Sequence, residues 1–106
     1  MKDILIFTLA AFLEIFGCFS FWAYLRLNKT VYYIVPGIVS LTAFAYMLTK
    51  VQTEFAGRAY AIYGGIYIVA SLFWLYLVEN QAPDMWDIIG AVVCLAGASI
   101  ILFVPR

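Results

Sequence analysis

Four long apolar runs dominate the sequence and leave little else from which the chain could build a fold. They cover residues 4–25, 31–49, 59–78 and 88–104, and the last three contain no charged residue. At ~1.5 Å per residue the first run makes a helix of about 33 Å, slightly longer than the ~30 Å hydrocarbon core of a bilayer. The others also reach the length of a spanning helix. The sequence therefore predicts an all-α membrane protein, with four transmembrane helices forming a single domain over residues 1–106.

The composition supports this prediction and excludes several classes of partner. Hydrophobic residues make up 67% of the chain and charged residues 11%, against roughly 25% charged in an average soluble domain. The six basic and six acidic residues give no net charge and no basic tract, so we expect no nucleic-acid partner. The connections are too short for an aqueous domain, and the function should lie within the lipid bilayer.

The residues that support catalysis or metal binding are missing or isolated. The chain has no histidine, and its two cysteines, Cys18 and Cys94, lie deep in apolar runs without paired spacing. We interpret both as packing residues, and we expect no metal and no cofactor. No nucleophile, base and orienting residue group together, so we do not expect an enzyme. The opening MKD leads directly into a full-length run, which favours a retained first helix over a cleaved signal.

The basic residues predict a weakly defined orientation. Four spans place both termini and the second connection on one side of the membrane. That side carries Lys2, Lys50, Arg58 and Arg106, and the other carries Arg26 and Lys29. This bias favours termini in the cytoplasm only slightly, and we therefore expect that the chain can insert in both orientations.

Glu14 lies at the midpoint of the first run, where a charge is costly, by about 3 kcal/mol on insertion scales. Such residues are rare and usually functional. The positions three and four residues away hold small side chains: Ala10, Ala11, Gly17 and Cys18. The opposite face holds Leu9, Phe12, Phe16 and Phe19. Glu14 should therefore lie in a groove that admits a ligand or a close helix. The competing interpretation is a carboxyl that only pairs with a neighbouring helix.

Arg58 is the obvious basic partner for Glu14, but it begins its helix while Glu14 lies ten residues into its own. That difference in depth is roughly 15 Å, more than one side chain bridges. We therefore expect Arg58 to extend toward the interface or to line a vestibule, and an ion pair requires that the helices slide or unwind.

The third run carries an aromatic stripe at helical spacing, formed by Tyr60, Tyr63, Tyr67 and Trp74, with Ser71 among them. Aromatic faces attract cations, and cages of rings suit quaternary ammonium groups. Packing or contact with lipid headgroups explains the stripe equally well from this helix alone. A buried carboxylate elsewhere in the chain favours the cation-binding interpretation.

Gly64 and Gly65 interrupt the same run near its middle. Adjacent glycines lower the cost of bending a helix and also let a neighbouring backbone come close. The pair therefore predicts either a hinge or a packing contact.

Small residues form a seam along the fourth run, at Gly90, Ala91, Cys94, Gly97 and Ala98. Such a seam is typical of close helix association in lipid. We expect it to pair two copies of the chain. Asp84 or Asp87 should cap the start of this helix, since short polar side chains accept bonds from free helix N–H groups.

The segments LEIFGCFSFW, VPGIVSL, GRAYAIYGGIYI and DIIGAVVCLAGASIILF resemble the YnfA family of small bacterial inner-membrane proteins, relatives of the small multidrug resistance transporters. The resemblance covers nearly the whole chain, and the GRAYAIYGGIY match is the most specific. It implies a small multidrug resistance-like bundle, an antiparallel homodimer of dual-topology chains, and proton-coupled export of cations through a glutamate on the first helix. In this sequence that glutamate is Glu14. Arg58 and the tyrosine-rich third helix differ from the drug-exporter pattern, which leaves the substrate class open.

We expect a mechanism in which one carboxylate, Glu14, binds a proton and a cation in turn. Burial favours the neutral, protonated form of a carboxyl group, and an arriving cation favours the ionised form. If the dimer changes its open side only when loaded, proton entry drives cation exit. A non-transporting membrane subunit, docked onto a larger complex through its fourth helix, is the alternative, and a pore is a weaker one.

Overall fold

Four α-helices make up most of the computed structural model, which describes residues 2–105. They are α1 (Lys2–Arg26), α2 (Ile34–Leu48), α3 (Ala56–Leu77) and α4 (Met85–Phe103), and a short 3₁₀ helix, η1 (Val31–Tyr33), leads into α2. Each helix, with η1 counted into α2, is long and apolar enough to cross a bilayer. The prediction of an all-α protein with four membrane spans is confirmed, and the chain is a multi-pass membrane protein.

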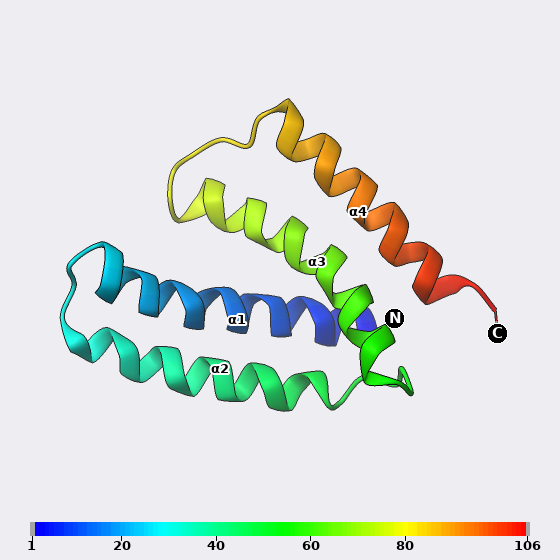
Figure 1. Cartoon of the computed structure of the whole chain (residues 1–106), viewed down its shortest axis with the longest axis horizontal. Coiled ribbons are helices and arrows are strands. Elements are labelled where there is room, and N and C mark those ends of the chain that lie inside the picture. Colours follow the sequence, from blue (N-terminus) through cyan, green and yellow to red (C-terminus); the bar gives the residue numbers. More distant parts are fainter. Residues whose placement is uncertain (1, 106) are drawn as a thin grey trace. The chain divides into compact units, whose positions relative to one another are not determined.

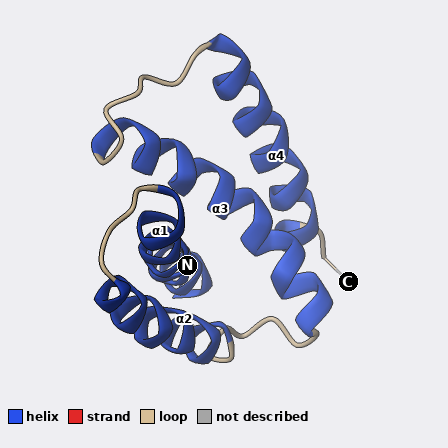
Figure 2. Cartoon of the chain, turned by 60° about the vertical axis from the view of Figure 1, so that its left-hand side comes forward, coloured by secondary structure: helices blue, strands red, loops and turns tan. Residues whose placement is uncertain are grey.

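The helices fall into two compact units, Met1–Val51 and Gln52–Arg106, each of them an antiparallel pair. In the first helix pair α1 packs along α2 (Figure 1). In the second helix pair α3 packs along α4, and Figure 2 shows the long connection that joins them. The candidate residues can therefore be assigned to one pair or the other.

The helices begin at different residues from the apolar runs that predicted them. The runs start at residues 4, 59 and 88, whereas α1, α3 and α4 start at Lys2, Ala56 and Met85. The reason is that backbone hydrogen bonding continues into the polar membrane boundary, which a count of apolar residues leaves out. The second run starts as η1 and becomes α-helical at Ile34, with Pro36 in the first turn, where its missing N–H costs no helical hydrogen bond. Arg106, counted in the charge bias, lies outside the described residues, as does the side chain of Lys2.

An asparagine in the left-handed conformation ends the long helix of each pair. Asn28 has φ 58° and Asn80 has φ 57°, a region that asparagine tolerates better than most residues. Beside Asn28, the N–H of Lys29 donates to the carbonyl of Ala23 at 3.1 Å. The residue after Asn80 makes the equivalent bond at 3.0 Å. Each asparagine thus closes a helix and turns the chain back toward its partner helix.

The start of α4 is fixed by a capping box. The carboxylate of Asp84 accepts from the N–H of Asp87 at 2.9 Å, and the carboxylate of Asp87 accepts from the N–H of Asp84 at 3.0 Å. Two of the otherwise unpaired N–H groups of the first turn are thereby satisfied. The expectation that one of these two residues caps the helix is confirmed, and both take part.

Basic side chains near the helix ends lie over aromatic rings about one turn earlier. The guanidinium of Arg26 is 4.6 Å from the ring centroid of Trp22, and the ammonium of Lys50 is 4.6 Å from that of Tyr46. This cation–π contact keeps the charged group near aromatic residues that favour the membrane boundary.

Candidate functional site

The backbones of α1 and α2 touch at two glycines. A Cβ atom on Gly17 would lie 3.0 Å from the carbonyl oxygen of Gly37 and 2.7 Å from Cγ of Leu41. A Cβ atom on Gly37 would lie 3.0 Å from the carbonyl oxygen of Gly17. Any larger side chain at either position would push the helices apart. Gly17 therefore belongs to the contact between the two helices.

A hydrogen bond between the helices lies one turn away from this contact. The Ser40 hydroxyl on α2 donates to the carbonyl oxygen of Leu13 on α1 at 2.6 Å, and Ser40 is buried with 6% of its surface exposed. Neither Ser40 nor Gly37 was predicted from the sequence as a site residue. Their spacing, two small residues three positions apart in an apolar run, is a pattern that could have indicated a packing face.

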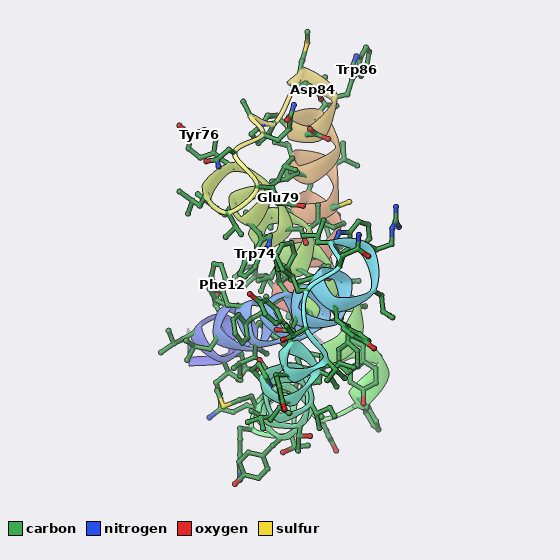
Figure 3. The ribbon with its side chains drawn as sticks, turned by 90° about the vertical axis from the view of Figure 1, so that its left-hand side faces the viewer. Phe12, Trp74, Tyr76, Glu79, Asp84 and Trp86 are labelled. Atoms are coloured by element: carbon green, nitrogen blue, oxygen red, sulfur yellow. The ribbon has the colours of Figure 1, made fainter. Side chains whose placement is uncertain are left out.

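Glu14 is half-buried and follows Leu13 directly, so it lies beside this contact line on α1. Of the small residues around it, Ala10 and Ala11 are fully buried and Gly17 is buried, whereas Cys18 is exposed. Large apolar side chains on the opposite face of α1 are exposed: Leu9, Phe12 and Phe16. Figure 3 labels Phe12 among them. Phe19, which was predicted on the same face, is half-buried. The helix thus presents three of the four bulky residues outward, and small residues lie beside its carboxylate in the sequence.

Arg58 lies in the second helix pair, in the first turn of α3, with an exposed side chain. Its guanidinium carbon lies 5.8 Å from the ring centroid of Phe55. This contact belongs to the same series of cations over aromatic rings as those at the ends of α1 and α2. That Arg58 extends toward the interface or lines a vestibule stays a prediction.

The aromatic stripe on α3 separates into parts with different surroundings. Tyr63 is buried, with 8% of its surface exposed, and its ring lies 5.9 Å from that of Tyr67 at an interplanar angle of 58°. Tyr60 is exposed, while Tyr67 and Trp74 are half-buried. The tilted Tyr63–Tyr67 pair is a favourable aromatic arrangement. The stripe therefore contains one compact pair of rings rather than a uniform aromatic surface.

Gly64 and Gly65 have different environments. A Cβ atom on Gly65 would lie 2.6 Å from Cβ of Ala98 and 3.1 Å from the carbonyl oxygen of Cys94. A Cβ atom on Gly64 would meet nothing within 4 Å among the described residues. Gly65 is therefore required for the close approach of α3 and α4. Only Gly64 keeps the unhindered backbone expected of a hinge.

The small residues of α4 lie on two different faces. Ala91, Cys94 and Ala98 are buried or half-buried, and two of them contact the backbone of α3 at Gly65. In contrast, no described residue comes within 4 Å of a Cβ atom placed at Gly90 or Gly97. Part of the seam that was predicted to pair two copies therefore packs against α3 of the same chain, because Ala91, Cys94 and Ala98, spaced three and four residues apart, face α3. Gly90 and Gly97 lie outside this contact and remain exposed.

Gly90 and Gly97 belong to a larger exposed surface, here called the outer face of α4. Its members recur at alternating spacings of four and three residues and are all exposed: Trp86, Gly90, Val93, Gly97 and Ile100. This is the heptad spacing by which one helix packs along another. A second helix can lie close to it at the two glycines.

A groove of about 460 Å³ opens in the second helix pair, between the C-terminal half of α3 and the N-terminal half of α4. Its walls include Leu72, Phe73 and Tyr76 from α3 and Ile88, Val92 and Leu95 from α4. Figure 3 shows Tyr76 and Trp86 toward the end of the pair that holds the connection. The lining contains no carboxylate and no basic side chain. The candidate ion site is the neighbourhood of Glu14.

Comparison with known families agrees with the features described above. A family model described as "Uncharacterised BCR, YnfA/UPF0060 family" matches the chain over residues 1–106. No solved structure matches it significantly. The family match covers both helix pairs and includes Glu14 and the glycine-rich part of α3.

Proposed function

The chain belongs to the YnfA/UPF0060 family, and on that premise we propose that two copies form a transporter that exports a small cationic compound in exchange for protons bound at Glu14. The transporter would lie in the bacterial inner membrane. Its two copies would be oriented antiparallel, which the small bias in basic residues permits because a single chain can insert in either orientation.

The observation that carries the proposal is the position of Glu14. The other five acidic residues, Asp3, Glu54, Glu79, Asp84 and Asp87, lie in connections or in the first turn of a helix. Glu14 lies in the middle of α1, half-buried and surrounded by small residues. An ionisable group at that depth is costly and is usually retained for a function.

Exchange follows from the two states of one carboxyl group. A low-dielectric environment favours the protonated, neutral form, whereas a nearby cation favours the ionised form. Proton and cation therefore compete for Glu14. When the site opens to one side of the membrane at a time, competition becomes coupled transport, because each ligand must leave before the other enters.

The aromatic rings of α3 support a cationic rather than an anionic substrate. Tyr63 and Tyr67 form a ring pair, and we assign these residues, with Tyr60 and Trp74, to the lining of the substrate path. Ring faces attract ammonium groups, by ~0.5 to 2 kcal/mol depending on desolvation. Gly64, which no described residue crowds, would allow α3 to bend as the open side changes.

Reconstituted liposomes with an imposed pH gradient test the proposal. We expect uptake of at least one member of a panel of permanently charged ammonium ions by the wild-type protein. Glu14→Gln keeps the shape and removes the titratable group, so it should reduce uptake to the level of protein-free liposomes. Asp3→Asn, in the first turn of the same helix, is the matched control and should retain uptake.

Unchanged gradient-driven uptake in Glu14→Gln would refute Glu14 as the exchange site. A wild-type protein that moves none of the ammonium ions would refute their export. Co-purification with a larger membrane complex through the outer face of α4 would then favour a non-transporting subunit.

A further inference from the structure

Ser40 uses its hydroxyl differently from the comparable residues of its helix pair. The hydroxyls of Thr8, Ser20 and Thr42 donate to carbonyls four residues earlier in their own helices. Ser40 donates across to Leu13 on α1. Ser20 and Ser40 are equally buried, each with 6% of its surface exposed. Burial alone therefore does not explain the bond between helices.

The acceptor of this bond belongs to the peptide group that carries Glu14. The carbonyl of Leu13 and the N–H of Glu14 are parts of one planar unit. A carbonyl oxygen has two lone pairs, so it can accept from the hydroxyl in addition to its helical bond. The Ser40 hydroxyl, 2.6 Å from that oxygen, thus restrains the plane from which the Cα atom of Glu14 extends.

A second restraint acts one turn later. Gly17 touches Gly37 through the backbone, and Gly37 lies three residues before Ser40 on the same helix. The turn of α1 from Leu13 to Gly17 is therefore held to α2 at both of its ends. Glu14 lies inside that turn.

We propose that Ser40 is a positioning residue for Glu14, which locks the Glu14 turn of α1 to α2 so that the two helices move as one body. The inference rests on the proposed exchange at Glu14 and adds the element that responds to it. When a cation replaces the proton, a displacement of the Glu14 turn also moves α2, because the Leu13–Ser40 bond joins them. Without this bond the displacement would stay within α1. Ser40 itself touches neither proton nor substrate.

Ser40→Ala and the matched control Ser20→Ala test this role, since each removes one equally buried serine hydroxyl. For Ser40→Ala we expect the maximal exchange rate to fall about 3- to 20-fold, the range that hydroxyl bonds between membrane helices correspond to. The KM for the cation should stay within about twofold, because the carboxylate that binds it is intact. Ser20→Ala should match the wild type in both quantities.

Ser40→Cys separates the hydrogen bond from the volume that the side chain fills. A thiol fills the space but is a weak donor, so its rate should be closer to that of Ser40→Ala than to the wild type. The carbonyl ¹³C shift of Leu13 should change in Ser40→Ala and stay unchanged in Ser20→Ala. Equal rates and equal ¹³C shifts for the two alanine variants would overturn the inference, as would full recovery of the rate in Ser40→Cys.

Failure of the proposed exchange is recognised separately. A wild-type protein without exchange contradicts the proposed function, whatever the variants do. In that case the mobility of the Glu14 side chain, measured by NMR relaxation, still decides the positioning role. It should rise in Ser40→Ala and not in Ser20→Ala, and equal mobility in both would overturn it.

Discussion

Both helix pairs pack closely at glycine residues, but they differ in which small residues lie outside the contact between the two helices. In the first pair, Gly17 and Gly37 lie against each other, and Ser40 adds a hydrogen bond beside the contact. In the second pair, Gly65 alone provides the close approach, against Cys94 and Ala98. The contact in the first pair thus takes a glycine from each helix, whereas the second leaves Gly64, Gly90 and Gly97 outside its contact.

This difference suits the two helix pairs to different roles. The pair that holds Glu14 is fixed from within by backbone contact and a hydroxyl bond, as a site that must keep its geometry requires. The second pair carries an apolar outer face on α4 that its own packing does not cover. In lipid such a face associates only when backbones can come close, which its two glycines permit. We therefore propose that the ion site lies in the first pair and that the contact between copies lies in the second.

The largest expected effect is on assembly. Gly97→Leu should shift the protein from dimer to monomer and abolish exchange, because a large side chain on the outer face keeps a second copy away. The helix pair itself should be unaffected, since no described residue lies within 4 Å of the added Cβ. Energy transfer between labelled chains, measured as lipid is added, gives the dimer fraction. An unchanged dimer would show that copies pair through another surface.

Ala98→Leu is the contrasting variant on the inner face of α4. Ala98 faces Gly65 and has 8% of its surface exposed. Leucine there should disrupt the contact between α3 and α4 within one chain and lower the yield of folded protein. If Gly97→Leu and Ala98→Leu behave alike, the division of α4 into two faces is wrong.

A smaller effect is expected from the adjacent glycines of α3. Gly65→Ala should destabilise the second pair by about 1–3 kcal/mol, the usual cost of overpacking, because the new Cβ would lie 2.6 Å from that of Ala98. Gly64→Ala should be neutral or slightly stabilising, since alanine favours the helix by up to ~1 kcal/mol. Unfolding in mixed micelles measures both. Equal losses would contradict the assignment of packing to Gly65 alone.

The extent to which the sequence predicts the fold follows from the bilayer. Spanning helices need a fixed length of apolar residues, so four runs were sufficient to define four helices. The capping role of Asp84 and Asp87 also followed from residue type. Which small residue contacts which surface did not follow from residue type, because Gly90 and Ala91 are both small and are adjacent in the chain. Only the direction from which α3 packs decides that one faces inward and the other outward.

The site was predicted unevenly for a similar reason. Glu14 could be identified because an isolated carboxylate in an apolar run is unusual. The spacing of Gly37 and Ser40 could have indicated a packing face but not the hydrogen bond between helices, because a hydroxyl in an apolar run most often bonds to its own helix, as that of Thr42 does on α2. The bond from Ser40 to Leu13 depends on how closely α1 approaches α2, which the two glycines determine together.

The smallest effect concerns the start of α4. Asp84→Ala should cost about 1 kcal/mol of stability, because it removes the acceptor for the N–H of Asp87. Asp84→Asn keeps an acceptor and should cost much less. Neither variant should alter exchange at Glu14, which lies in the other helix pair. A large loss of exchange in Asp84→Asn, with normal stability, would place part of the ion path at this connection.

Proton release on cation binding tests the central claim most directly, without any transport step. The purified protein in weakly buffered detergent solution is mixed, at a series of pH values, with a saturating ammonium ion that the wild type transports. We expect that the wild type releases protons to the solution, that Asp3→Asn releases as many, and that Glu14→Gln releases none. Equal release from wild type and Glu14→Gln would contradict competition of proton and cation for this one carboxyl group.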